Sequence, residues 1–162
     1  MPLGALTARR KPLQDSPTPA GNPTAAAALV RLEALSGKQE YVNIAEDTLD
    51  CFAGIVEHFG LYAGSYGLAL ERLLADPVQV VIVGSGADAE RLEATAVAGY
   101  AVNKSVIRID PARLAAGGLP EALAETVLQV PAQTGAWVLV CKGRTCLPPV
   151  TDADALLKAL SQ

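Results

Sequence analysis

The sequence changes character at Asp76-Pro77, and this change limits what the chain can fold into. Before this point, apolar residues recur at intervals of three and four, which is the period of an amphipathic helix. After it, short β-branched runs bounded by glycine or polar residues alternate with helical stretches, a pattern typical of strands joined by helices. The ring of Pro77 disfavours helical geometry at Asp76, so a helix should end there. The chain is therefore predicted to be mixed α/β, with its helices first.

The first part of the chain is predicted to be an arm followed by packed helices. Residues 1–23 carry five prolines and little periodicity, which indicates an extended arm. The helical segment, residues 24–76, should hold three helices, which begin near Thr24, Tyr41 and Ser65. The second is expected to be long and to stop at Gly60. One face of it carries nine regularly spaced residues: Tyr41, Ile44, Ala45, Thr48, Leu49, Phe52, Ile55, Val56 and Phe59.

Residues 77–162 are predicted to form a small α/β unit. Three strands and three helices alternate in it, at Val78–Val83, Ala87–Ala98, Ser105–Ile109, Pro120–Leu128, Ala136–Cys141 and Thr151–Leu160. A strand, a helix and a second strand in this order favour a parallel crossover. We therefore expect a three-stranded, mostly parallel sheet. In the sequence TDAD, Thr151 and Asp154 are expected to cap the last helix reciprocally.

Composition excludes several classes of protein. The formal net charge is −4 and the isoelectric point is near 5.0, whereas a nucleic-acid-binding protein needs a basic face to neutralise phosphates. Its apolar runs are too short to span a bilayer, and the N-terminal sequence lacks the apolar core of an export signal. Three cysteines do not suit a secreted disulfide framework. We expect a cytoplasmic protein that binds neither nucleic acid nor membranes.

A glycine-rich turn after the first predicted strand is the strongest ligand-binding pattern. Gly84, Gly86 and Ala89 fit the spacing of a dinucleotide-binding turn, and Asp110 follows the second predicted strand. In such a site the glycines let the backbone approach a pyrophosphate, and the acid binds a ribose hydroxyl. Small residues are also favoured in any strand-to-helix turn, and the acidic Asp88 would oppose a phosphate. The unit also has too few strands for a complete dinucleotide fold. Nucleotide binding is thus an alternative.

The cysteines are a second candidate. Cys141 and Cys146 are separated by the sequence KGRT, whose two cations favour a thiolate, and a turn there would bring the sulfurs together. The pair is therefore either a reversible disulfide, acting as a thiol switch, or packing at a strand end. A zinc site would need about four ligands, and only Cys51 and His58 remain. No metal site is expected.

A third candidate is the loop of residues 14–23, QDSPTPAGNP, in which Asp15 and Asn22 offer polar side chains before a helix. The alternative is that they only shape the loop and cap the helix.

The chain resembles a particular family in two places. The first is DSPTPAGN followed by an Ala/Leu-rich helix and SGKQEY, and the second is the closing stretch WVLVCKGRTCLPPVTDADAL. The family is that of the thioredoxin-domain-containing proteins related to spermatogenesis-associated protein 20.

The resemblance implies that the chain corresponds to the C-terminal part of such a protein. Members of the family combine a thioredoxin-like domain with a six-hairpin (α/α) toroid, and residues 24–76 would supply its last hairpins. The expected function is that of an accessory or interaction module, which docks onto the remainder of a toroid protein or onto a second copy of itself. No catalytic residue stands out and no cofactor is expected. The lone His58 is expected only to complement a helix dipole.

Overall fold

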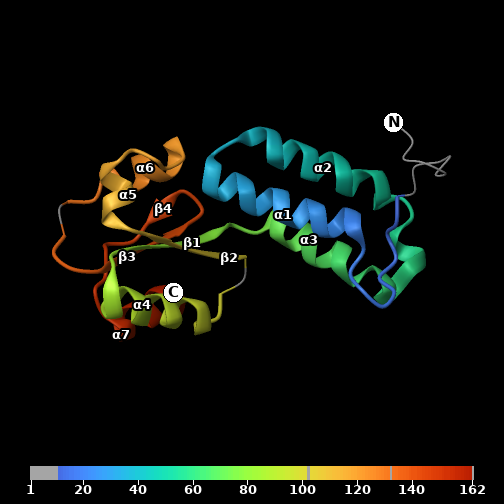
Figure 1. Cartoon of the computed structure of the whole chain (residues 1–162). Coiled ribbons are helices and arrows are strands. Elements are labelled where there is room, and N and C mark those ends of the chain that lie inside the picture. Colours follow the sequence, from blue (N-terminus) through green and yellow to red (C-terminus); the bar gives the residue numbers. More distant parts are fainter. Residues whose placement is uncertain (1–10, 102, 132, 162) are drawn as a thin grey trace. The chain divides into compact units, whose positions relative to one another are not determined.

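A computed structural model describes residues 11–101, 103–131 and 133–161, and the chain divides into two compact units (Figure 1). The first, here called the helical unit, comprises the described residues up to Val30 together with Gln39–Leu74. The second, the α/β unit, comprises Arg31–Lys38 and the described residues from Ala75 onward. Helices precede a sheet with interspersed helices, so the predicted mixed α/β class is confirmed.

Three α-helices and a 3-10 helix make up the first half of the chain. They are α1 (Gly21–Ser36), α2 (Gln39–Ala53), η1 (Val56–Ala63) and α3 (Gly64–Leu74). Helix α1 begins earlier than predicted, because the last three residues assigned to the arm already belong to it. A proline in the first turn of a helix is tolerated, since the amide groups of that turn have no partner within the helix. The C-terminal position of α1 is taken by Gly37 with a φ of 70°, as the sequence indicates.

The long second helix predicted from Tyr41 to Gly60 is instead two elements. Helix α2 ends at Ala53, and the backbone tightens so that the amide of Ile55 donates to the oxygen of Phe52 at 3.0 Å, a three-residue step. The 3-10 helix η1 follows and contains Gly60 with a φ of 50° and a ψ of −126°, outside helical geometry. Gly54, between the two, lowers helix propensity where α2 stops.

The core of the helical unit depends on a narrower stripe of α2 than the periodicity predicts. Ala45, Leu49 and Phe52 are buried at helical spacing, whereas Ile44 and Ile55 are 49 % and 48 % exposed. The buried stripe packs with side chains from the loop before α1, from α1 and from η1 and α3: Leu13, Ala26, Val30, Ala63, Tyr66 and Ala69. The Tyr66 hydroxyl donates to the backbone oxygen of Leu49 at 3.3 Å, so this buried phenol keeps a polar partner.

The α/β unit contains a four-stranded sheet with the order β2-β1-β3-β4. Its elements are β1 (Val78–Val83), α4 (Gly86–Ala98), β2 (Lys104–Ile109), α5 (Pro111–Ala115), α6 (Glu121–Leu128), β3 (Trp137–Lys142), β4 (Thr145–Cys146) and α7 (Ala153–Ser161). Strands β1 and β2 are parallel, as expected for a strand–helix–strand unit. Strand β3 runs antiparallel to β1, and β4 antiparallel to β3. The sheet is therefore mixed and four-stranded, not three-stranded and mostly parallel.

Helices cover both faces of this sheet (Figure 1). On one face α4 and α7 pack against alternate residues of β1 and β3; this core includes Val80, Ile82, Leu92, Val138, Val140 and Leu156. On the other face α6 packs against the remaining residues, with Val81, Ile109, Leu123, Trp137, Leu139 and Cys141. Strands covered on both faces read as continuous apolar runs, which explains VQVVIV and WVLVC.

Polar side chains close the start of α7 and the end of α4. The Asp152 carboxylate accepts a hydrogen bond from the amide of Ala155 at 2.8 Å and caps α7, a role that the sequence had suggested for Thr151. At the C-terminal end of α4 the Lys104 ammonium donates to backbone oxygens, including that of Val97 at 3.2 Å. Burial lowers the pKa of this ammonium, while the carbonyl ends of the helix favour its charge.

Candidate functional site

Asp15 lies at the centre of a hydrogen-bond cluster in the helical unit. Its carboxylate accepts bonds from the Ser65 amide at 2.7 Å, from the Ser65 hydroxyl at 2.5 Å and from the Ala20 amide at 2.7 Å. Its own amide donates to the oxygen of Tyr62 at 2.7 Å. The carboxylate therefore ties the loop before α1 to the N-terminus of α3, where a negative charge is favourable. These hydrogen bonds give Asp15 a structural role in the helical unit.

The hydrogen bonds from Ser65 and Ala20 hold the pKa of the Asp15 carboxyl below its ordinary value. The unfolded chain then binds a proton more readily than the folded one, so this contribution to stability is present at neutral pH and is lost as the pH falls through the folded-state pKa. Replacing Asp15 with Asn would place an amide donor against the Ser65 amide. We expect Asp15→Asn to lower the thermal midpoint by several degrees at pH 7, by about as much down to the ordinary carboxyl pKa of 3.8, and by less below it. Circular dichroism melts across this range measure the difference, and a pH-independent difference would contradict the assignment.

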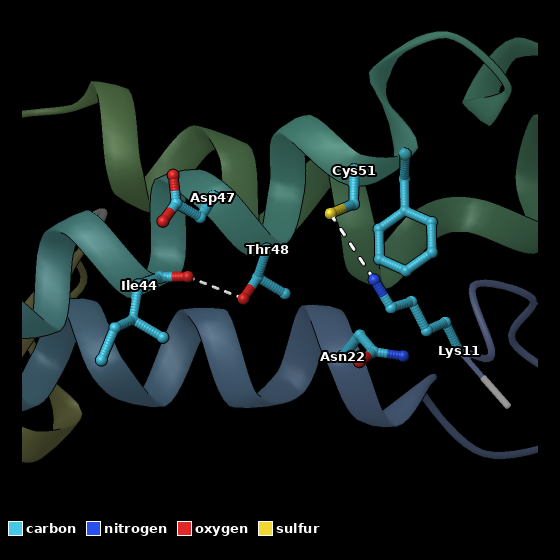
Figure 2. A pocket seen from close by; sticks show the side chains of 7 residues that line it. Lys11, Asn22, Ile44, Asp47, Thr48 and Cys51 are labelled. Carbon is cyan, nitrogen blue, oxygen red and sulfur yellow. Dashed lines mark hydrogen bonds between the residues drawn. The ribbon is translucent and has the colours of Figure 1, made fainter. Parts of the chain in front are cut away.

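Asn22 lies in a groove between the start of α1 and α2 (Figure 2). The groove has a volume of about 230 Å³ and is lined by Lys11, Asn22, Ile44, Asp47, Thr48, Cys51 and Phe52, a set that does not include Asp15. The Asn22 amide donates to the backbone oxygen of Pro12 at 2.9 Å and so holds the segment before α1 beside the helix. Asp15 and Asn22, which the sequence places in one loop, therefore make their contacts at different places: Asp15 at the start of α3 and Asn22 in this groove.

The sequence pattern placed Ile44 and Thr48 on one apolar helix face and did not predict that they line a groove with Lys11, Asp47 and Cys51. Ile44, Thr48 and Cys51 repeat at helical spacing beside the buried stripe of α2, and that spacing is the signal that could have grouped them. The Lys11 ammonium reaches across to the Cys51 thiol, with 3.8 Å between Nζ and Sγ (Figure 2). Cys51 is exposed and is not in a disulfide. The groove offers a cation, a carboxylate at Asp47 and an apolar floor, which suits a small amphipathic ligand.

Gly84 and Asp110, two of the proposed dinucleotide residues, come together at the C-terminal ends of β1 and β2. Gly84 directly follows β1, and its amide donates to the oxygen of Ile109, the residue before Asp110, at 3.1 Å. However, a Cβ on Gly84 would lie 2.7 Å from the Cβ of Ala136, so close packing already accounts for this glycine. The Asp110 carboxylate accepts from the Ala112 amide at 2.8 Å and caps α5. Gly86 has a φ of 73° and open space around it, which a tight turn explains.

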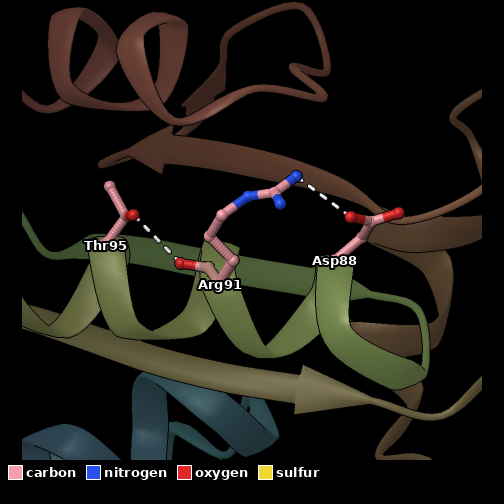
Figure 3. Close-up of polar contacts among 3 residues, drawn as sticks. All are labelled: Asp88, Arg91 and Thr95. Carbon is pink, nitrogen blue, oxygen red and sulfur yellow. Dashed lines mark hydrogen bonds and ion pairs between the residues drawn. The ribbon is translucent and has the colours of Figure 1, made fainter.

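Charge at the start of α4 also differs from that of a phosphate site. Asp88 lies in the first turn and pairs with Arg91, with 3.0 Å between its Oδ1 and Nη2 (Figure 3). Both side chains are well exposed, so the pair adds little stability. This ion pair engages the guanidinium of Arg91, the arginine closest in sequence to the turn. It also keeps the Asp88 carboxylate where a phosphate would bind. Nucleotide binding by Gly84, Gly86 and Asp110 stays a prediction without added support.

Cys141 and Cys146 form a disulfide across the hairpin of β3 and β4. The two residues are direct cross-strand partners, with 3.9 Å between their Cα atoms. The amide of Leu147 donates to the oxygen of Val140 at 2.9 Å, which makes the adjacent Cys141–Cys146 pair the non-hydrogen-bonded type, whose side chains lie closest. Cys141 is 5 % exposed and faces the core under α6, while Cys146 is exposed on the edge strand.

Among residues 11–101, 103–131 and 133–161, no group of three or more His, Cys, Asp or Glu side chains is arranged to hold a metal ion. His58 lies in η1 rather than in the last turn of a long helix, and its Nδ1 is 3.2 Å from the oxygen of Ile55. The helices described here also lack the length and apolar character needed to cross a membrane.

Comparison of the chain with protein-family models, curated proteins and solved structures gave no match. The resemblance to the thioredoxin-domain-containing family therefore stays a prediction.

Proposed function

We propose that the chain is an accessory or interaction module, the C-terminal part of a thioredoxin-domain-containing toroid protein, and that its helical unit supplies the docking surface. The observation that carries this proposal is the exposure of large apolar side chains between α2 and the end of α3. Leu61 is 98 % exposed, Leu74 76 % and Leu68 64 %, and Ile44, Ile55 and Tyr62 are exposed as well. We call these six residues the apolar set.

Single exposed apolar residues are normal on any protein. The apolar set is notable because its six members fall between residues 44 and 74, whereas the longer α/β unit exposes five such residues in its described part: Leu32, Val97, Tyr100, Leu128 and Leu157. Burying a leucine side chain contributes about 1.5–3 kcal/mol. Docking of this stretch onto further helical hairpins, or onto a second copy, would recover that free energy.

The α/β unit is proposed to serve as the scaffold of the module. Its sheet is covered by helices on both faces, so its strands need no partner to be buried. No catalytic residue and no cofactor are assigned to either unit. The location proposed for the module is the cytoplasm, in line with its composition.

The proposal predicts self-association when no other partner is present. Sedimentation velocity of the purified chain should show species larger than 16.7 kDa that increase with concentration. The double substitution Leu61→Lys and Leu68→Lys adds two charges to the apolar set and should leave a monomer. Leu128→Lys, at a residue of the α/β unit that is 70 % exposed, is the matched control and should still associate. A wild-type chain that stays monomeric at every concentration, or a control that dissociates equally, would contradict the proposal.

A further inference from the structure

The Cys141–Cys146 hairpin has the asymmetry of a thiol–disulfide exchange site. One sulfur belongs to a side chain that is 5 % exposed and packed in the core, and the other to an exposed residue on the edge strand. An attacking thiolate must reach one sulfur and displace the other. The exposed Cys146 is the accessible target. We propose that this disulfide exchanges with thiol reductants by attack on Sγ of Cys146.

The chemistry requires a thiol reductant, either a dithiol or two monothiols. In the first step its thiolate bonds to Sγ of Cys146, the disulfide bond breaks, and Sγ of Cys141 leaves with the electron pair and takes up a proton. In the second step another reductant thiolate bonds to the reductant sulfur, and Sγ of Cys146 leaves and is protonated in turn. The protein gains two electrons and two protons, and the reductant becomes a disulfide.

The leaving group, Sγ of Cys141, lies in an apolar core that accommodates a neutral thiol. Once protonated, the Cys141 thiol is a small apolar side chain, and it lies in the core with Leu123, Val127 and Leu139. The reduced hairpin therefore buries no charge at this position. The exposed Arg144 lies two residues from Cys146 in the turn, and its positive charge favours an approaching thiolate, whereas the Lys142 ammonium donates to the backbone oxygen of Leu160 at 3.3 Å.

The hairpin is also held by contacts that do not involve sulfur. The amide of Gly143 donates to the oxygen of Pro77 at 2.9 Å and fixes the turn against the start of β1. Val138 and Val150 exchange two backbone hydrogen bonds of 2.8 and 2.9 Å beyond the disulfide. Reduction should therefore loosen the edge strand locally and leave the fold intact, so that the exchange is reversible.

The test is a redox titration of the native chain in glutathione buffers, with free thiols alkylated and counted by intact mass. With three cysteines and one disulfide, the count should rise from one to three in a single step and return on reoxidation. Cys51→Ser should lower both plateaus by one thiol and leave the midpoint unchanged. Reduced thioredoxin in place of glutathione distinguishes a protein dithiol from a small monothiol as the faster reductant. A count that rises only in denaturant, or a reduced chain that loses its circular dichroism spectrum, would overturn the proposal.

The direction of attack is tested with Cys141→Ser and Cys146→Ser, each made in the Cys51→Ser chain so that the exposed Cys51 thiol cannot react. Cys141→Ser leaves the exposed thiol, which should form a mixed disulfide with oxidised glutathione. Cys146→Ser leaves the buried thiol, which should form none on the same timescale. The opposite result would overturn attack at Cys146. Arg144→Gln should slow exchange with glutathione several-fold at low ionic strength and less at high salt.

Discussion

Replacing Gly84 with alanine is expected to destabilise the α/β unit by about 3 kcal/mol. The added methyl would lie 2.7 Å from the Cβ and 2.9 Å from the Cα of Ala136, and the backbone at Gly84 has a φ of 155°. The Cα of Ala136 is a backbone atom, so it cannot relieve the contact by a change of side-chain rotamer. Trp137 is the only tryptophan and is buried in this unit, so its fluorescence during denaturant unfolding reports the loss directly.

Gly86→Ala is the matched control for this experiment. Gly86 has a positive φ of 73° but no atom within 4 Å of an added Cβ. Only the backbone preference is lost, at a cost of about 1 kcal/mol. A cost at Gly86 equal to or larger than that at Gly84 would show that close packing against Ala136 is not what requires a glycine.

Leu49→Ala is expected to cost the helical unit about 2–5 kcal/mol. Leu49 is 1 % exposed in the middle of α2 and is among the largest fully buried side chains. The helical unit has no tryptophan, so thermal melting followed by circular dichroism at 222 nm is the measurement. Leu68→Ala, at a residue that is 64 % exposed, should change the midpoint little. If Leu49→Ala also had no effect, the three helices would not be packed around it in the isolated chain.

Local sequence patterns predicted most helices and strands of this fold. The features that they did not predict, such as the direction of β3, depend on contacts between residues distant in sequence. β-branched runs gave β1 and β3 to within a residue at each end, since both are buried on two faces. The direction of β3 is not encoded in its own residues, because it depends on how α5 and α6 return the chain to the sheet. Strand β4 was missed because two residues beside a hairpin turn show no periodicity.

The same division holds for the candidate sites. The spacing of Cys141 and Cys146 indicated that they could pair, because a four-residue connection closes locally. For Asp15, by contrast, the partner is Ser65, fifty residues along the chain, and no local pattern points to it. Gly84 matched a phosphate-binding motif, but the neighbour that requires a glycine there is Ala136, on the approach to a different strand.

The shortness of β4 limits how copies of this protein can polymerise. A sheet grows into a fibril by adding strands at two open edges, one on each side of every copy. On one side β4 offers two residues and is followed by Pro148 and Pro149, which have no amide hydrogen to donate. Strand addition is then confined to β2, where the Lys104 ammonium is bonded to the end of α4 and Arg108 pairs with Glu93 at 3.2 Å. Within the described residues this leaves one edge for strand addition, which by itself would pair two sheets and would not extend a filament.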